Sequence, residues 1–255
     1  MLELIDTHAH LDEVTDLDNT ARRAMQAGVT AIIAVGQDLE SNRRTLQLAS
    51  QYPGLVYPAI GLHPWSLGEM DGSRLDENIG FIRNNLTEAV ALGEVGLDYD
   101  KRVLKVAAKD HQQEVLRRLL ELAAGQSKPV SFHSRYAWKD ALQIVKGAGL
   151  KKVVFHWYTG FSSTLVEIIE AGYFISATPA AEYHDEHRRA IREAPLSQLL
   201  LETDCPVYYG RDGRYRSQPS DVLRSLRAVA AIKGMDETEV ASITTANARQ
   251  LFGIQ

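Results

Sequence analysis

Two histidines separated by one residue follow the first apolar stretch of the chain. They belong to the segment Asp6-Thr7-His8-Ala9-His10. Side chains two positions apart on a β-strand lie on the same face, so both imidazoles are expected to point in one direction. Two imidazoles directed at one point suit a metal ion such as Zn²⁺ or Mn²⁺. The pair therefore predicts a metal site at the end of the first strand.

Four more side chains that can bind metals stand at the ends of later apolar stretches. They are Glu94, His133, His156 and Asp204. Each is expected at the C-terminal end of a strand, which is where parallel α/β barrels build their active sites. Six ligands are too many for one tetrahedral ion and suit two ions that share a ligand. Glu94 is the expected bridge, because a carboxylate has two oxygens.

Other polar residues at strand ends are predicted to take part in catalysis or in binding the substrate. Asp204 is expected to accept a proton from the attacking water, since it is both a ligand and an acid beside the metals. His63 can bind a phosphate or protonate the leaving oxygen, and Arg135 offers a guanidinium fork for phosphate oxygens. Asp6, Glu202 and Asp98 either orient ligand imidazoles or form hydrogen bonds in the core.

Aromatic and basic residues gather after the expected strand ends. Tyr99, Trp157 and Tyr158 are predicted to bind substrate, because aromatic rings can stack on unpaired bases. Further aromatic residues on the same side are Trp65, Trp138, Phe161, Tyr208, Tyr209 and Tyr215. Loop residues that can supply local positive charge are Lys101, Arg102, Arg211, Arg214 and Arg216. These aromatic and basic residues together favour the end of a single-stranded nucleic acid, rather than a duplex, as the substrate.

The elements that must position these residues alternate between short apolar runs and longer segments of helical period. Strands are predicted at Leu2–Asp6, Ala31–Val35, Val56–Ile60, Val90–Glu94, Pro129–His133, Lys152–His156, Tyr173–Ser176 and Leu199–Asp204. Helices are predicted at Asp18–Ala27, Glu40–Gln51, Arg74–Leu86, Asp110–Ala124, Trp138–Gly147, Ser162–Ala171, Glu182–Ala194, Ser220–Lys233 and Asp236–Phe252. Eight strand–helix units close a parallel barrel, so the prediction is an α/β fold, a TIM-type (β/α)8 barrel, as a single domain over residues 1–255.

The composition excludes several kinds of partner and cellular environment. The 255 residues include 28 basic and 33 acidic side chains, for a net charge of −5, which excludes a broad basic surface for duplex nucleic acid. The single cysteine, Cys205, rules out an internal disulfide and fits a reducing compartment. No apolar run approaches the roughly 18 residues needed to span a bilayer. A cytoplasmic protein without membrane contact is expected.

Five motifs, taken in order, carry a resemblance to a known family. They are Asp6-Thr7-His8-Ala9-His10-Leu11-Asp12, Gly61-Leu62-His63-Pro64, Gly93-Glu94-Val95-Gly96-Leu97-Asp98-Tyr99, His133-Ser134-Arg135 and Glu202-Thr203-Asp204-Cys205-Pro206. This ordered set resembles the TatD family of metal-dependent deoxyribonucleases, within the amidohydrolase-like superfamily. The likeness extends over nearly the whole chain.

The resemblance implies a TIM barrel with two metal ions. It assigns His8, His10, Glu94 and Asp204 to the first ion, and it assigns Glu94, His133 and His156 to the second. It places His63 near the substrate phosphate. Family members remove nucleotides from DNA 3′ ends, often with Mg²⁺ or Mn²⁺.

The leading hypothesis is a metal-dependent hydrolase, specifically a 3′–5′ exonuclease on single-stranded DNA or another small phosphodiester. Hydroxide activated by two divalent ions (Mg²⁺, Mn²⁺ or Zn²⁺) would attack phosphorus. One alternative keeps the metals but cleaves a carboxylic ester or amide, as in a lactone or an aminoacyl-tRNA. A second alternative is a non-catalytic binding or assembly subunit with a vestigial metal site.

Overall fold

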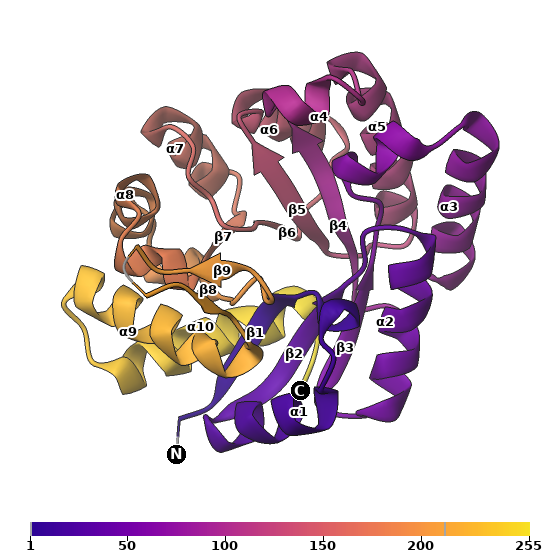
Figure 1. Cartoon of the computed structure of the whole chain (residues 1–255). Coiled ribbons are helices and arrows are strands. Elements are labelled where there is room, and N and C mark those ends of the chain that lie inside the picture. Colours follow the sequence, from indigo (N-terminus) through magenta and orange to yellow (C-terminus); the bar gives the residue numbers. More distant parts are fainter. Residues whose placement is uncertain (1, 212) are drawn as a thin grey trace.

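The centre of the protein is a parallel sheet of eight strands whose spatial order follows the sequence. The computed structural model describes residues 2–211 and 213–255. The strands are β1 (Leu4–Ala9), β2 (Val29–Val35), β3 (Val56–Ile60), β4 (Ala91–Asp98), β5 (Val130–Arg135), β6 (Val153–Phe155), β7 (Phe174–Ala177) and β8 (Leu199–Leu201). With helices between the strands (Figure 1), this arrangement confirms the predicted α/β barrel.

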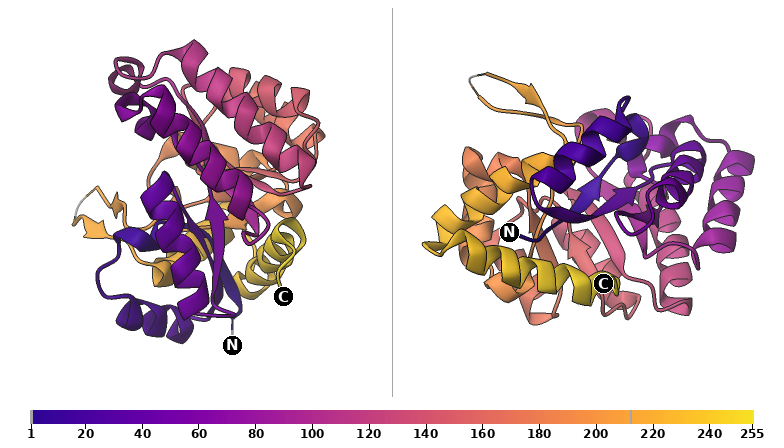
Figure 2. Two further views of the ribbon diagram at one scale, coloured as in Figure 1. Left: turned by 90° about the vertical axis from the view of Figure 1, so that its right-hand side faces the viewer. Right: turned by 90° about the horizontal axis from the view of Figure 1, so that it is seen from below.

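Helices connect the strands and form the outer layer (Figure 1). The α-helices are α1 (Leu17–Gln26), α2 (Leu39–Gln51), α3 (Gly72–Asn85), α4 (Lys101–Leu104), α5 (Lys109–Gly125), α6 (Trp138–Gly147), α7 (Ser162–Glu170), α8 (Asp185–Glu193), α9 (Val222–Lys233) and α10 (Glu237–Phe252). Short 3₁₀ helices are η1 (Leu11–Glu13), η2 (Pro64–Glu69), η3 (Pro179–Glu182), η4 (Leu196–Gln198) and η5 (Pro219–Asp221). A hairpin of β9 (Tyr208–Tyr209) and β10 (Tyr215–Arg216) projects from the barrel (Figure 2).

Apolar side chains form two clusters, one on each face of the sheet. Neighbouring strand residues alternate between them: Ile33 belongs to the smaller cluster, whereas Ile32 and Ala34 belong to the larger one that joins the sheet to the helices. The smaller cluster also contains Leu251 and Phe252 of α10, which runs across the lower end of the barrel (Figure 2). Helix α10 thus covers the N-terminal ends of the strands, and a functional site is expected at the opposite, C-terminal ends.

Two backbone hydrogen bonds join the first strand to the segment after the last one. The amide of Asp204 donates to the carbonyl of His8 at 2.9 Å, and the amide of His10 donates to the carbonyl of Cys205 at 2.8 Å. These bonds close the barrel between β1 and the chain that follows β8. The same bonds bring three of the predicted metal ligands side by side.

The buried carboxylate of Asp6 reinforces this closure. Its two oxygens accept hydrogen bonds from the backbone N–H of Thr203 at 2.8 Å and from the Thr203 hydroxyl at 2.6 Å. Among described residues, no hydrogen bond links Asp6 to an imidazole ring. Of the two predicted roles, the structure therefore gives Asp6 the one in the core.

Replacement of Asp6 by alanine is expected to lower the free energy of unfolding by about 2–4 kcal/mol, because two buried donors of Thr203 lose their acceptor. Urea denaturation followed by circular dichroism measures this. Asp236→Ala, which removes a helix cap at the surface, is the control and is expected to cost about 1 kcal/mol. Equal losses in the two variants would contradict the role assigned to Asp6.

The C-terminal ends of the first, fourth, fifth and eighth strands differ from the prediction by two residues or more. Glu94 was expected to end the fourth strand, but β4 continues to Asp98, where it still pairs with β5. Asp204 was expected to end the eighth strand, but β8 ends at Leu201. β4 is buried along its whole length, and the residues that follow β8 are also buried although they are not part of the strand. Burial and apolar character therefore do not fix the residue at which strand pairing ends.

Within the described ranges, the structure contains no helix that is both long enough and apolar enough to cross a bilayer.

Candidate metal centre

The six predicted metal ligands, called the ligand cluster below, meet at the C-terminal end of the barrel. One half forms around Oε2 of Glu94, which lies 3.4 Å from Nε2 of His8 and 3.5 Å from Nε2 of His10. Oδ1 of Asp204 lies 3.6 Å and 3.3 Å from the same two nitrogens. These four groups are the first ligand set.

The other half of the cluster forms around Oε1 of Glu94. This oxygen lies 2.8 Å from Nε2 of His156 and 3.0 Å from Nδ1 of His133. The two nitrogens are themselves 3.3 Å apart. Glu94 and these two histidines are the second ligand set. The Glu94 carboxylate therefore lies between the two sets, with one oxygen directed at each.

The chemistry of these groups fits divalent cations. Nε2 of His8 is completely buried and makes no hydrogen bond to any described residue, so it has an unused lone pair or proton inside the cluster. Glu94 and Asp204 are also buried, and burying two carboxylates together is costly unless cations balance their charge. Imidazole nitrogen and carboxylate oxygen are ligands that Zn²⁺ and Mn²⁺ accept.

The histidines of the second ligand set are each supported from behind by a carboxylate. Nε2 of His133 lies 3.2 Å from Oδ2 of Asp98, and Nδ1 of His156 lies 3.4 Å from Oε1 of Glu202. A carboxylate on the far ring nitrogen fixes the orientation and the proton position of a ligating imidazole, and makes it a stronger ligand. Asp98 and Glu202 thus contact imidazoles, as one of their two predicted roles required.

Neutral groups support the histidines of the first ligand set. Nδ1 of His8 lies 3.2 Å from the hydroxyl of Ser131, and Nδ1 of His10 lies 3.0 Å from the amide of Gln37. Neither partner was identified from the sequence. Ser131 precedes His133 by two residues, and Gln37 follows the end of β2. The strand-end rule that selected the ligands could therefore have found Gln37.

His63 lies beside the second ligand set, with Nε2 3.5 Å from Oε1 of Glu94. Its Nδ1 accepts a hydrogen bond from the backbone N–H of Trp65 at 3.1 Å, so the ring proton must sit on Nε2, which faces the cluster. Burial lowers the pKa of His63 to about 4, although Glu94 acts in the opposite direction. The ring is therefore a neutral hydrogen-bond donor aimed at the centre.

Protons compete with metal for the cluster. Burial lowers the pKa of His10, but the hydrogen bond to Asp204 and the charges of Asp204 and Glu94 outweigh it and raise the pKa to about 9. The pKa of His156 is also raised. Burial alone lowers this pKa, but the charge of Glu94 and the hydrogen bonds of the His156 ring with Glu202 and Glu94 outweigh that effect. A protonated imidazole must lose its proton before that nitrogen can bind a cation.

Mn²⁺ binding is therefore expected to release protons and to become tighter as the pH rises from 6.5, the ordinary pKa of histidine, to about 9. Isothermal titration calorimetry at pH 7 in buffers of different ionisation enthalpy measures the released protons. Affinity that does not change over this range would contradict the proton competition. His10→Gln should release fewer protons than the unmodified protein.

Two of the residues predicted to stack on substrate lie elsewhere. Tyr158 is only 1% exposed, and its hydroxyl donates to the carbonyl of Phe161 at 2.9 Å. It packs in the core, so the prediction that it contacts a base is wrong. The hydroxyl of Tyr99 is directed at Asp140 of α6, and Lys109 covers its ring at 4.3 Å. Tyr99 therefore belongs to the layer between helices.

The remaining two predicted substrate residues lie at the open end of the barrel. Trp157 directly follows His156 and is partly exposed, with its ring 5.4 Å from that of Tyr209. Arg135 ends β5 and forms an ion pair of 3.2 Å with Asp100. Both stay predicted substrate contacts.

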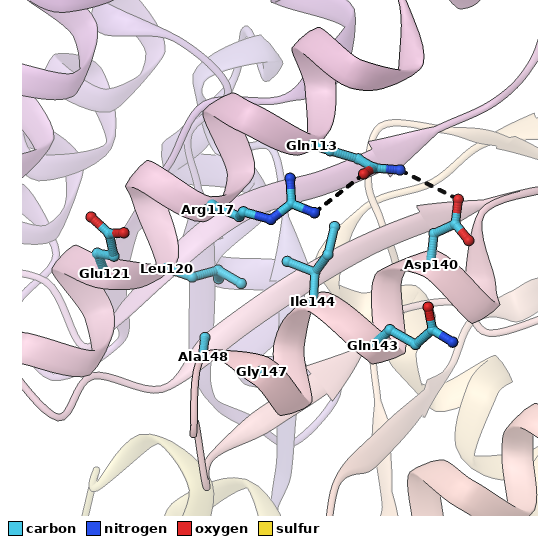
Figure 3. Close-up of a pocket in the computed structure, with 9 residues that line it drawn as sticks. All are labelled: Gln113, Arg117, Leu120, Glu121, Asp140, Gln143, Ile144, Gly147 and Ala148. Atoms are coloured by element: carbon cyan, nitrogen blue, oxygen red, sulfur yellow. Dashed lines mark hydrogen bonds between the residues drawn. The ribbon is translucent and has the colours of Figure 1, made fainter.

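A hollow of about 660 Å³ lies between α5 and α6 on the outside of the barrel (Figure 3). Gln113 lies between Arg117 and Asp140 and bonds to both. No predicted metal ligand lines this hollow, so it is separate from the ligand cluster.

Comparison with known proteins decides the family. The model of the family described as TatD related DNase matches residues 5–253. The chain belongs to the TatD family. The family was predicted from the five ordered motifs, and the match confirms it.

Several TatD-family proteins resemble the chain over nearly its whole length. Human deoxyribonuclease TATDN3 is 33% identical, with 98% of this chain and 94% of the relative covered. The protein named 3′-5′ ssDNA/RNA exonuclease TatD from Erwinia tasmaniensis is 32% identical, with 94% of each chain covered. The crystal structure of YJJV, a TatD homologue from Escherichia coli K12, superimposes with a TM-score of 0.89 at 29% identity, covering 99% of this chain and 98% of that one.

Proposed function

We propose that this TatD-family protein is a metal-dependent nuclease that removes nucleotides from the 3′ ends of single-stranded DNA. The observation that carries the proposal is the position of Glu94, whose two oxygens face two separate sets of ligand atoms. Such a carboxylate can bridge two divalent cations, Mg²⁺, Mn²⁺ or Zn²⁺. The names of relatives, which include a deoxyribonuclease and a 3′-5′ ssDNA/RNA exonuclease, support the choice of substrate.

In this proposal the first ligand set holds one cation and the second ligand set holds the other. Two bound cations would supply an activated water as the nucleophile and neutralise charge on the phosphate. Asp204 is the carboxylate with most access to that water, because its side chain is 10% exposed whereas that of Glu94 is 3% exposed. Asp204 therefore accepts the proton of the nucleophile.

His63 binds the phosphate as a neutral donor. Its Nε2 proton faces the cluster, and a second proton on Nδ1 would oppose the N–H of Trp65. Protonation of the leaving oxygen by His63 is therefore disfavoured. A hydrogen bond from Nε2 to a non-bridging phosphate oxygen is the role that this geometry supports.

Exposed aromatic rings around the open end favour an unpaired strand. Each of the exposed aromatics follows a barrel strand: Trp65, Tyr136, Phe161 and Tyr208. Arginine accompanies two of them, since Arg135 lies 5.6 Å from the ring of Tyr136 and Arg214 lies 5.5 Å from that of Tyr208. Aromatic rings can stack on the bases of a single strand, and neighbouring arginines can bind its phosphates. Such local positive charge is needed here because the protein as a whole has a negative net charge.

The test is a digest of DNA labelled at the 5′ or the 3′ end, single-stranded and duplex, in parallel with Mg²⁺, Mn²⁺ or Zn²⁺. Stepwise shortening from the 3′ end of the single strand is expected, with loss of activity after chelation. Metal-dependent turnover of a carboxylic ester or amide, without DNA cleavage, would overturn the proposal in favour of the alternative chemistry. Absence of all turnover in the metal-loaded protein would favour the non-catalytic alternative.

A further inference from the structure

Trp65 is a large aromatic side chain that is held half in solvent beside the ligand cluster. It lies in η2, two residues after His63, and is 49% exposed. The segment around it is firmly packed: Leu67 is buried, and Gly68 lies so close to Val106 that an added Cβ would approach it to 2.6 Å. The ring is therefore presented in a fixed position.

The polar edge of the Trp65 ring reaches into the protein. Its indole N–H donates to Oδ2 of Asp98 at 2.6 Å, and the same oxygen lies 3.2 Å from Nε2 of His133. The backbone N–H of Trp65 donates to Nδ1 of His63, whose ring centroid lies 5.3 Å from that of Trp65. One residue thus contacts both the carboxylate behind a predicted ligand and the histidine expected to bind phosphate.

We infer that Trp65 determines how the substrate end is seated, with its exposed face stacking on the base of the nucleotide whose phosphate His63 binds. This inference rests on the proposed nuclease function and adds a residue to it. The indole N–H acts separately, as a positioning group: through Asp98 it holds His133 in the orientation that the second ligand set requires. Trp65 thus has a binding face and a structural edge.

The observations favour stacking over a purely structural role. A tryptophan needed only for its hydrogen bond to Asp98 gains nothing from leaving half its surface in water. Here the bond fixes the ring beside His63, so the face is ready for a planar partner without further ordering. Such preorganisation lowers the entropic cost of binding. An unpaired nucleobase is the planar group that a strand end carries next to its phosphate.

Trp65 can be observed directly, because the chain has three tryptophans. The fluorescence of Trp65 is obtained as the difference between the parent protein, which keeps Trp157, and the Trp65→Phe variant. Addition of oligodeoxyadenylate with nuclease-resistant phosphorothioate linkages, in the presence of Ca²⁺, is expected to quench its fluorescence with saturation. Fluorescence that does not change while the oligonucleotide binds, as followed by anisotropy of a labelled strand, would overturn the inference.

Variants separate the two roles of Trp65. Trp65→Ala is expected to raise the Kd for the oligonucleotide and the KM for DNA about 10- to 100-fold. Trp65→Phe keeps a ring but lacks the N–H, so it is expected to bind the oligonucleotide within a few-fold of the parent, while binding Mn²⁺ more weakly in calorimetry. Asp98→Asn should weaken Mn²⁺ binding in the same direction, by about 10- to 100-fold.

Met25→Ala is the matched control, since Met25 is 52% exposed and lies on α1, away from the cluster. It should leave oligonucleotide and Mn²⁺ binding unchanged. If the parent cleaves DNA and Trp65→Ala binds and cleaves as the parent does, this inference fails and the nuclease function stands. If the parent neither binds the oligonucleotide nor cleaves DNA, the proposed function itself fails.

Discussion

Glu94→Gln is expected to reduce DNA cleavage by about a thousandfold and to remove both metal ions. The carboxylate directs one oxygen at each ligand set, and an amide offers only one oxygen with no charge. Loss of metal assistance costs several kcal/mol of transition-state stabilisation, and each 1.36 kcal/mol is a factor of ten in rate. Elemental analysis gives the metal content, and the digest of end-labelled DNA gives the rate.

Glu182→Gln is the matched control for this change. Glu182 forms a surface ion pair of 2.7 Å with Arg224, so the same chemical change there should leave metal content and cleavage unaltered. Retention of two equivalents of metal by Glu94→Gln would contradict the bridging role. Full activity without metal would contradict the mechanism as a whole.

Asp204→Asn is expected to abolish cleavage, by about a thousandfold or more, while part of the metal remains bound. Among the described residues, the carboxylate of Asp204 forms ion pairs with the two histidines of the first ligand set, at 3.3 and 3.6 Å. The second ligand set, with Glu94, His133 and His156, is intact in this variant. About one equivalent of Mn²⁺ should therefore remain, countable by electron paramagnetic resonance.

Two other results of the Asp204→Asn experiment would contradict the roles assigned to Asp204. Near-normal cleavage would show that another group accepts the proton of the nucleophile. Loss of all metal would show that the two ligand sets bind their ions cooperatively, contrary to the expectation that the second set keeps its ion without Asp204. Thermal unfolding of the metal-free variant checks that the barrel remains folded, since the backbone of Asp204 bonds to His8.

The fold was predictable because its signals are local. Alternation of short apolar runs with helical segments requires only that buried strands be apolar and that helices have one apolar face. The helix α4 and the hairpin β9–β10 were not predicted, since four and two residues are too few to show a period. The predicted end of the fourth strand was displaced because β4 continues past the polar Glu94 through Val95, Gly96 and Leu97 to Asp98.

The sequence by itself determined the ligand types and their convergence at one end of the barrel. Parallel strands carry their C-terminal ends to the same edge, so residues as distant as His8 and Asp204 were placed together without knowledge of any contact. The sequence does not show which oxygen of Glu94 faces which histidines. That arrangement depends on the distances between strands, which the spacing of residues along the chain does not encode.

Only the tertiary structure decided which aromatic residues are free to meet a substrate. Tyr158 and Trp65 look equivalent in the sequence, since each follows a strand near a candidate histidine. Tyr158 is buried in the core, whereas Trp65 donates a hydrogen bond to Asp98 and is half exposed. Exposure depends on every neighbour that the folded chain brings to a side chain, so a local pattern of residues does not determine it.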